Sequence, residues 1–486
     1  MTLMDKRTKI VATISDKRCE PSFIRRLVEE GINVVRLNSA HINKEGFDRL
    51  VDNIRSVAPD IPILIDTKGA EIRTTRFEQD VHLCTGCKVT IVADPNDIST
   101  ANRICVNYEN FVRDVPVGAR VLIDDGEVEL RVLDKDEHQL YCEVENDGEL
   151  GSRKSVNVPD VHIDLPSVSQ RDHDFILYAI EREIAFIAHS FVRNRADVEA
   201  VQKVLDEHGG QGIKVISKIE NQEGVDNIEE ILDASYGIMV ARGDLGIEID
   251  FEKIPALQSD LIHRAILKKK PVIVATQMLH TMIHYPRPTR AEVSDVSGAI
   301  MMNTDAVMLS GETAYGKYPA EAVRTMARII KEAERHQKDR GGVKLKKGED
   351  DVVDVTSYLA KYTVKSTSKL GVKAIVTDVV SGRCARNLSA YRGEAPIYAI
   401  CQDARVARQL NLSYGIYPIY QSHEGYTRRQ YYAKALEILL NKGLLELDDM
   451  IAYIGGTLKD EVGTTSLDIS RVRDVLEYFA STQDQR

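Results

Sequence analysis

The sequence has no tryptophan, no long apolar run and no excess of positive charge. Without about 18 consecutive apolar residues there is no candidate transmembrane helix, and the charged N-terminus lacks the apolar core of a secretory signal. The formal net charge is −11 over 486 residues. This argues against nucleic acid as the main partner, because phosphate backbones favour a basic surface. We therefore expect a cytoplasmic protein with no membrane and no nucleic-acid partner.

Cysteine is also scarce. The 7 cysteines are scattered along the chain, and an odd, scattered set is typical of reduced thiols in a cytosol. Cys84 and Cys87 form a single C-x-x-C motif, for which a redox or zinc role is one hypothesis. With no second pair in the sequence, a hairpin turn around Gly86 is favoured.

What the sequence does contain is a series of short apolar runs rich in β-branched residues. Such runs indicate strands that are buried on both faces, which is typical of a parallel sheet. Eight runs favour a closed (β/α)8 TIM barrel, although a doubly wound open sheet would give a similar local pattern. The runs lie at residues 10–14, 32–36, 61–65, 184–188, 213–217, 236–240, 271–275 and 306–309.

One interval is too long for a single crossover. More than a hundred residues separate the third run from the fourth, and residues 70–164 alternate like short antiparallel strands. We expect an all-β domain inserted after the third strand, above the face where barrel active sites form. Further along, the charged residues 344–351 predict a linker, and alternating strands and helices follow it. The expected domains are therefore a catalytic α/β barrel (1–69 and 165–338), an inserted β-barrel lid (70–164) and a C-terminal α/β domain (352–486).

Polar residues follow most of the predicted barrel strands. Cations, carboxylates and hydroxyls together are what phosphoryl transfer requires, because the transferred group carries negative charge on its oxygens. Glu220 and Asp244 come from adjacent strands and could share one hard cation. The strand-end residues are Arg36, Asn38 and His41; Asp66, Lys68, Glu71 and Arg73; Lys218 and Glu220; Arg242 and Asp244; Thr276 and Gln277; and Ser310 and Glu312.

Two other motifs carry less weight. GETAYGK at 311–317 matches the spacing of a P-loop, but Tyr318 stands where a P-loop needs Ser or Thr to reach Mg²⁺. His280 and His284 have the spacing of zinc-binding histidines, but Thr281 replaces the Glu of the H-E-x-x-H motif. We interpret these histidines as part of a surface helix.

At this point the motifs resemble those of the pyruvate kinase family across nearly the whole chain. The family converts phosphoenolpyruvate and ADP into pyruvate and ATP in glycolysis, so the resemblance implies a phosphotransferase. The segments that carry it are RTKIVATI (7–14), DTKGAEIRT (66–74), ISKIEN (216–221), VARGDLG (240–246), ATQML (275–279), PRPTRAE (286–292) and MLSGETA (308–314).

The resemblance implies a role for each matching site residue. Lys218 would stabilise the phosphoryl group in flight, and Arg36 would contact the phosphate. Glu220 and Asp244 would hold the essential Mg²⁺ or Mn²⁺ ion. The backbone N–H groups of Gly243 and Asp244, with the Thr276 hydroxyl, would receive the substrate carboxylate, and Thr276 would also lie near the proton added to the enolate.

The resemblance also implies a potassium site. Asn38, Asp66 and Thr67 match family ligands for K⁺, but Ala40 stands where a Ser ligand is expected. Glu71 occupies the position at which K⁺-independent relatives tend to carry Lys, so dependence on K⁺ is favoured.

For the nucleotide, the matching positions are Asn38, His41, Arg73 and Lys154. The loop after the first strand reads SDKR (15–18), where relatives usually have Gly-Pro-Ala-Ser, so the preferred nucleotide stays open. The family is usually a homotetramer, and its C-terminal domain serves regulation and oligomerisation. Two other hypotheses remain: another metal-dependent barrel enzyme acting on phosphoenolpyruvate or pyruvate enolates, and a non-catalytic regulatory homologue that binds the same ligands.

Overall fold

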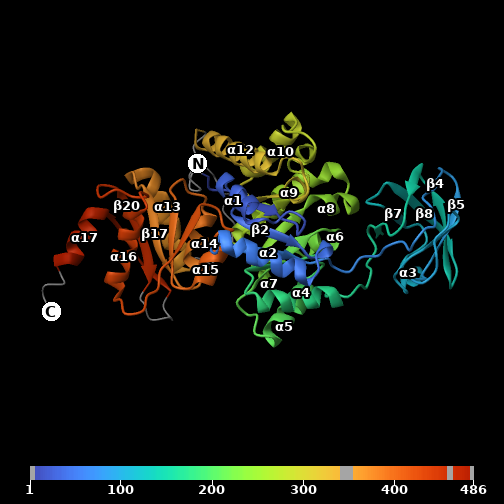
Figure 1. Cartoon of the computed structure of the whole chain (residues 1–486), viewed down its shortest axis with the longest axis horizontal. Helices are drawn as coiled ribbons and strands as arrows, with labels where there is room; N and C mark the ends of the chain where they lie inside the picture. Colours follow the sequence, from blue (N-terminus) through green and yellow to red (C-terminus); the bar gives the residue numbers. More distant parts are fainter. Residues whose placement is uncertain (1–5, 340–353, 457–462, 482–486) are drawn as a thin grey trace.

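The computed structural model describes residues 6–339, 354–456 and 463–481. Figure 1 shows an α/β barrel in the centre, a domain rich in β-strands at one end and an α/β domain at the other. The predicted linker at 344–351 lies outside the described residues. Within the described part of the chain, no helix is long and apolar enough to cross a membrane.

The central sheet is a closed barrel of eight parallel strands, as the sequence predicts. Going round the barrel, the strand order is β1-β16-β15-β14-β13-β12-β3-β2. The strands are β1 (Lys9–Thr13), β2 (Val34–Asn38), β3 (Ile63–Asp66), β12 (Phe186–His189), β13 (Lys214–Ile219), β14 (Gly237–Ala241), β15 (Val272–Ala275) and β16 (Ala306–Leu309).

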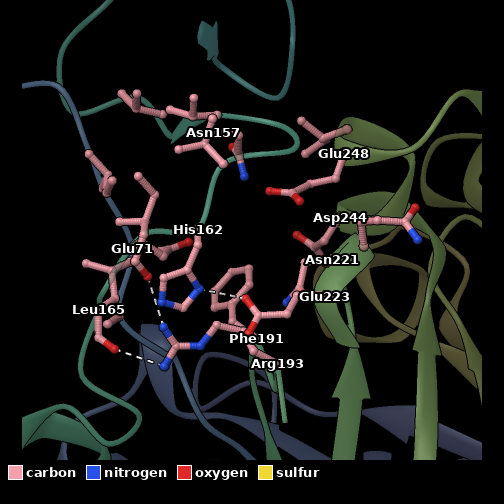
Figure 2. Close-up of a pocket in the computed structure, with 18 of the residues that line it drawn as sticks. Glu71, Asn157, His162, Leu165, Phe191, Arg193, Asn221, Glu223, Asp244 and Glu248 are labelled. Atoms are coloured by element: carbon pink, nitrogen blue, oxygen red, sulfur yellow. Dashed lines mark hydrogen bonds and ion pairs between the residues drawn. The ribbon is translucent and has the colours of Figure 1, made fainter. Parts of the chain in front are cut away.

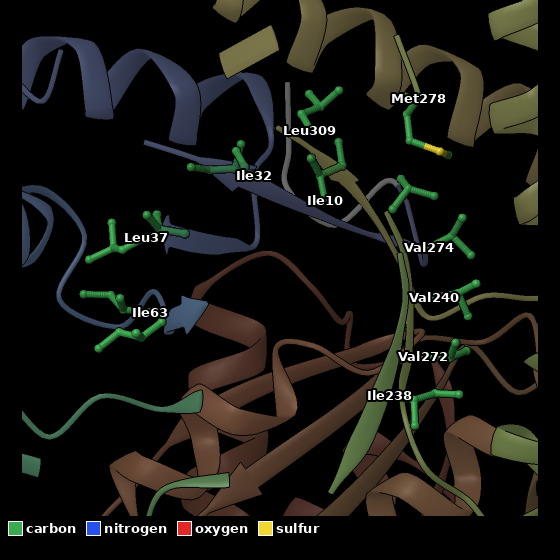
Figure 3. Close-up of a cluster of buried hydrophobic side chains, with 14 of the residues drawn as sticks. Ile10, Ile32, Leu37, Ile63, Ile238, Val240, Val272, Val274, Met278 and Leu309 are labelled. Atoms are coloured by element: carbon green, nitrogen blue, oxygen red, sulfur yellow. The ribbon is translucent and has the colours of Figure 1, made fainter. Parts of the chain in front are cut away.

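Burial on both faces explains the unbroken apolar runs. Within β1, Ile10 and Ala12 belong to the cluster between strands and outer helices, whereas Val11 belongs to a second cluster with Val34. Successive side chains of a strand point to opposite faces, so apolar residues are needed at consecutive positions along the buried part of each strand. Figure 3 shows part of the outer cluster, including Ile10.

Helices surround the barrel, and many of them begin at a capping residue. Asn43, Ser169, Asn194 and Asn221 each accept a hydrogen bond from a first-turn backbone N–H, which satisfies one of the free donors at a helix start. The barrel helices are α1 (Pro21–Glu30), α2 (Lys44–Val57), α4 (Gln170–Glu181), α5 (Arg195–Glu207), α6 (Gln222–Asp226), α7 (Ile228–Ala234), α8 (Arg242–Glu248), α9 (Ile254–Leu267), α10 (Arg290–Met301), α11 (Gly311–Ala314) and α12 (Pro319–Asp339).

The domain inserted between β3 and β12 is mostly β-structure, as predicted. It holds a six-stranded sheet in the order β11-β7-β8-β9-β5-β6 and a two-stranded sheet of β10 and β4. Its elements are β4 (Val81–Leu83), β5 (Lys88–Val92), β6 (Arg103–Cys105), α3 (Phe111–Asp114), β7 (Arg120–Ile123), β8 (Val128–Lys135), β9 (Gln139–Val144), β10 (Gly148–Leu150) and β11 (Val156–Asn157).

The C-x-x-C motif forms a turn, but the predicted hairpin is wrong. Gly86 has a φ of 82°, and the Cys87 N–H donates to the Cys84 carbonyl at 3.0 Å. The strands on either side pair elsewhere, β4 with β10 and β5 with β9. The turn therefore connects two sheets. No group of three or more His, Cys, Asp or Glu residues suited to a metal ion occurs among the described residues.

The C-terminal domain is a five-stranded sheet with helices, in the order β19-β18-β17-β20-β21. The predicted alternation of strands and helices is found as far as β20, whereas β21 follows β20 directly and is antiparallel to it. The elements are α13 (Val355–Leu370), β17 (Ala374–Val379), α14 (Arg383–Ala390), β18 (Ile397–Cys401), α15 (Ala404–Leu410), β19 (Ile416–Tyr420), α16 (Arg428–Asn441), β20 (Met450–Gly456), β21 (Thr464–Arg471) and α17 (Val472–Ser481).

Candidate active site

Lys218 lies near the end of β13, at the centre of a buried charge cluster. Its ammonium group is 2.8 Å from Glu220 Oε1 and 3.1 Å from Asp66 Oδ1, and it donates a hydrogen bond of 2.8 Å to Ser190 Oγ. Burial by itself would lower the pKa of Lys218, but the carboxylates of Asp66, Glu220 and Asp244 raise it above its usual value. The lysine is therefore a permanent cation at the mouth of the barrel.

Arg36 adds a second cation to this cluster. From the middle of β2, its Nε donates to Asp66 Oδ2 at 2.6 Å, and its Nη1 donates to Thr13 Oγ1 at 3.0 Å. Burial would raise the pKa of Asp66, but Arg36 and Lys218 together hold it below its usual value. Asp66 thus fixes both cations in place, each anchored on a different strand.

Glu220 and Asp244 form a pair of carboxylates beside Lys218. Glu220 is buried, and its Oε2 accepts from the Phe191 N–H at 2.7 Å. Burial raises the pKa of Glu220, the Lys218 charge opposes the rise, and Asp244 adds to it. Among the described residues, Asp244 has no ion pair or side-chain hydrogen bond, and it lines the cavity that contains Lys218. Two carboxylates that repel each other and line the same cavity fit a hard divalent cation.

The loop after β15 brings Thr276 to the start of α8. Thr276 Oγ1 accepts from the Gly243 N–H at 2.7 Å, and Arg242 donates to the Thr276 carbonyl at 2.7 Å. Thr276 has a φ of 68° and Gln277 a φ of 53°, which is a strained backbone for residues other than glycine. Strained residues of this kind cluster at functional sites. In this conformation the Thr276 hydroxyl oxygen lies within hydrogen-bonding distance of the Gly243 N–H, beside the carboxylates.

The same mouth opens into a cavity of about 460 Å³. Three of the four residues predicted for the nucleotide, Asn38, His41 and Arg73, line it, and Arg73 forms an ion pair of 3.0 Å with Glu71. Lys154 does not line this cavity. Its ammonium group is 2.5 Å from Asp124 within the inserted domain.

The three residues predicted for K⁺ also lie at this mouth. Asn38 Oδ1 accepts from the Ala40 N–H at 3.0 Å, and Thr67 Oγ1 accepts from the Ser190 N–H at 3.0 Å. Asp66 Oδ1 is close to Lys218. Amide, hydroxyl and carboxylate oxygens are therefore present together, which is a donor set that a hard monovalent cation could use.

Ser190 and Phe191 are functional candidates that the sequence analysis missed. They follow β12, the fourth barrel strand, and they contact Lys218 and Glu220 through the bonds described above. Ser190 Oγ also donates to the Thr67 carbonyl at 2.7 Å. Their position in the sequence is the signal that could have identified them. They follow the apolar run 184–188 and His189, and so stand where barrel active sites form.

A second cavity, of about 550 Å³, lies between the barrel and the segment that closes the inserted domain. Figure 2 shows Asn157 of that segment and Glu248 of the barrel extending toward each other across it. His162 Nδ1 is 2.9 Å from Glu223, so the segment is tied to the barrel (Figure 2). Asp244 lines both cavities, which makes the second one a neighbour of the active site.

Comparisons with known proteins agree with this geometry. The family model for the pyruvate kinase barrel domain matches residues 5–323, and the model for the pyruvate kinase alpha/beta domain matches residues 357–469. A pyruvate kinase of Borreliella burgdorferi is 44% identical over 98% of this chain and 99% of the relative. A pyruvate kinase of Bacillus licheniformis is 42% identical over 95% of this chain and 80% of the relative.

A solved protein structure has the same fold. A crystal structure of a pyruvate kinase from Cryptosporidium parvum superposes with a TM-score of 0.89 and 34% sequence identity, covering 97% of each chain. The resemblance seen in the sequence motifs is thus confirmed, as is the assignment to the phosphotransferases. The chain belongs to the pyruvate kinase family.

Proposed function

We propose that this chain transfers the phosphoryl group of phosphoenolpyruvate to ADP and then protonates the enolate, giving pyruvate and ATP. The observation that carries the proposal is the position of Lys218, a buried cation held by Asp66, Glu220 and Ser190 at the barrel mouth. A β-phosphate oxygen of ADP attacks phosphorus while the bond from phosphorus to the enol oxygen breaks. The electron pair of that bond stays on the enolate oxygen.

Lys218 and Arg36 neutralise charge during this transfer. Negative charge spreads over the three outer oxygens of the phosphoryl group in the transition state. The two cations are already oriented by Asp66, so little reorganisation is needed when the charge develops. Both are catalytic residues in this proposal.

The substrate carboxylate binds at the first turn of α8. The N–H groups of Gly243 and Asp244 belong to the first turn of α8, where anions are favoured. The Gly243 N–H would exchange its present acceptor, Thr276 Oγ1 at 2.7 Å, for the carboxylate. The Thr276 hydroxyl can donate to the same carboxylate after exchanging its own partner, the Ala275 carbonyl at 2.7 Å. Thr276, directly or through a water molecule, then delivers the proton to the carbon of the enolate.

Glu220 and Asp244 would hold Mg²⁺ or Mn²⁺, and Asn38, Asp66 and Thr67 would hold K⁺. When bound, these cations supply positive charge against the phosphate and carboxylate oxygens of the substrates. The donor chemistry of both residue sets supports this assignment, since every side chain offers oxygen. Mn²⁺ and Mg²⁺ share these oxygen ligands.

Asn38, His41 and Arg73 would contact the nucleotide, and Lys154 would join them from the inserted domain. In this proposal the catalytic barrel spans 1–69 and 165–338, the inserted lid spans 70–164, and the domain at 352–486 serves regulation and oligomerisation. We also propose a cytoplasmic homotetramer, as is usual in the family.

The test is pyruvate formation from phosphoenolpyruvate by the full chain, with ADP, Mg²⁺ and K⁺ each omitted in turn. We expect turnover that requires ADP and Mg²⁺ and that rises with K⁺. Consumption of phosphoenolpyruvate without ADP would instead favour another barrel enzyme. Binding of phosphoenolpyruvate without any turnover, for all common nucleoside diphosphates, would favour a regulatory homologue.

A further inference from the structure

A cluster of positive charge lies at the opposite end of the barrel from the active site. Here α15 of the C-terminal domain faces the loop before β13, and a cavity of about 140 Å³ lies between them. We call it the Arg408 cavity. It is lined by Ile180, Glu183, Ile184, Ala185, Gly209, Gly210, Gly212, Ile213, Arg405, Arg408 and Gln409.

Arg408 lies in this cavity without a directly bonded side-chain partner among the described residues, and its charge also acts on the neighbouring Asp403. Within the described part of the chain its guanidinium group makes no ion pair and no side-chain hydrogen bond, although it is half-buried. Arg405, one turn earlier on α15, is paired with Asp403 at 2.9 Å. Glu183 is the acidic member of the lining. A half-buried arginine without a partner is unusual, because charges removed from water are normally paired.

The surroundings of the cavity are also positively charged. Burial, with the nearby Arg386 and Arg405, lowers the pKa of Lys214. Burial, with Arg182 and Arg408, lowers the pKa of Arg55, although Glu183 and Asp52 oppose the shift. Both pKa values are lowered, whereas a cation with a close anionic partner has a raised pKa. An anion in the cavity would relieve the mutual repulsion of the cations.

The shape of the cavity suits a phosphate group. Gln409 donates to the Gly212 carbonyl at 2.6 Å, which holds α15 against the loop. A side chain at position 212 would lie 3.2 Å from Arg405 Nη1, so the glycine leaves room for that guanidinium group. The volume of about 140 Å³ corresponds to about four or five water molecules, and a phosphate has four oxygens. Arginine forks match phosphate oxygens in pairs.

We propose that the Arg408 cavity binds a phosphate group, either inorganic phosphate or the phosphate of a small phosphomonoester, between residues 209–213 and α15. Lys214 begins β13 and Lys218 lies near its other end. The strand of 6 residues spans about 17–20 Å, so this site is distinct from the phosphate subsite of the reaction. A bound phosphate would join the C-terminal domain to the strand that carries Lys218.

The test is calorimetric titration of inorganic phosphate into the full chain at constant ionic strength. Phosphoenolpyruvate is left out, because it is itself a phosphomonoester and would compete for the cavity, and Lys218→Met, which lacks the central cation of the active site, is titrated alongside wild type. We expect both chains to bind one phosphate in the Arg408 cavity. Arg408→Gln should bind it about tenfold more weakly or worse, because a hydrogen bond between charged groups is lost, and Arg408→Lys should lie between the two.

Arg328→Gln is the matched control. Arg328 is exposed on α12 and lies outside the cavity, so this variant should keep the affinity of wild type. If Arg408→Gln fails to fold by circular dichroism, Arg405→Gln replaces it with the same expected loss. A parallel titration with glycerol 3-phosphate distinguishes the two sources, since tighter binding than that of inorganic phosphate would identify a phosphomonoester site.

Two results would overturn the proposal. One is the absence of phosphate binding in both wild type and Lys218→Met. The other is an affinity that is equal in wild type, Arg408→Gln and Arg405→Gln. Because the comparison among variants does not require turnover, its failure is distinguishable from a failure of the proposed reaction.

Discussion

Single charges decide the chemistry at the barrel mouth. Arg36, Asp66, Lys218 and Glu220 form a chain of alternating cations and anions, each within 3.1 Å of the next. Buried charges are tolerated when every one of them is paired, and removal of one partner is strongly destabilising. A substitution in this chain therefore affects stability as well as catalysis, and the two must be measured separately.

A prediction for His189 concerns the pH dependence of stability and can be tested without measuring turnover. His189 is 1% exposed at the end of β12, neither ring nitrogen has a hydrogen-bond partner among the described residues, and burial lowers its pKa to about 4. Between pH about 6.5 and about 4 the unfolded chain binds more protons than the folded one. We expect the free energy of unfolding to fall by about 3 kcal/mol as the pH is lowered through this range.

The measurement is urea unfolding at a series of pH values for wild type and His189→Phe. The variant cannot titrate at this position, so its stability should fall less on acidification. His138→Phe, at an exposed histidine of the inserted domain, should follow wild type. Parallel pH profiles for wild type and His189→Phe would contradict the assignment of a buried neutral imidazole.

Among the elements, the loop after β15 stores backbone strain. Its two residues with positive φ, Thr276 and Gln277, allow a comparison of strain with chemistry. Thr276→Gly removes the hydroxyl that meets the Gly243 N–H, and we expect about a 10²-fold loss of kcat. Gln277→Gly relieves the same kind of strain without touching that hydroxyl, so it should keep most of the activity.

Stability measurements complete this comparison. Left-handed backbone costs about 1–2 kcal/mol for residues other than glycine, whereas glycine also makes the unfolded chain more flexible. We therefore expect the two glycine variants to have similar melting temperatures. A loss of activity in Gln277→Gly equal to that in Thr276→Gly would indicate that loop rigidity, and not the hydroxyl, matters.

The barrel strands could be predicted from the sequence because burial on both faces leaves an unbroken apolar run. β21 could not, because its TTSLDISR sequence is mostly exposed or half-buried and mixes polar with apolar residues. The turn at Cys84–Cys87 was predicted from Gly86, but local sequence does not reveal which strands pair. Most of the candidate site could be predicted from charged and hydroxyl side chains at strand ends. Ser190 and Phe191 are harder to predict, because one contributes an uncharged hydroxyl and the other only a backbone N–H.

At the scale of the whole molecule, a buried ion pair joins the barrel to the C-terminal domain. Arg392 Nη2 is 2.7 Å from Asp305 Oδ2, and Asp305 Oδ1 accepts from the Tyr414 N–H at 2.9 Å. The sequence alone could not reveal this contact, since its partners are 87 residues apart. Such pairs are costly to break, because the remaining charge stays buried.

Arg392→Met should therefore destabilise the chain by about 3–5 kcal/mol. The double variant Arg392→Met/Asp305→Leu removes both charges and should regain part of that loss, although the Tyr414 N–H loses its acceptor. Thermal unfolding of wild type, both single variants and the double variant checks this. Losses that simply add in the double variant would show that the two side chains do not interact.

The central claim is that Lys218 performs phosphoryl transfer, and one measurement tests it most directly. It is the rate of pyruvate formation from phosphoenolpyruvate and ADP, with Mg²⁺ and K⁺, for wild type, Lys218→Met and Lys268→Met. Lys268 is a barrel lysine paired with Glu229 and Asp233 away from the site. We predict about a 10³-fold loss of kcat in folded Lys218→Met and a normal rate in Lys268→Met. A folded Lys218→Met that keeps most of its activity would contradict the account.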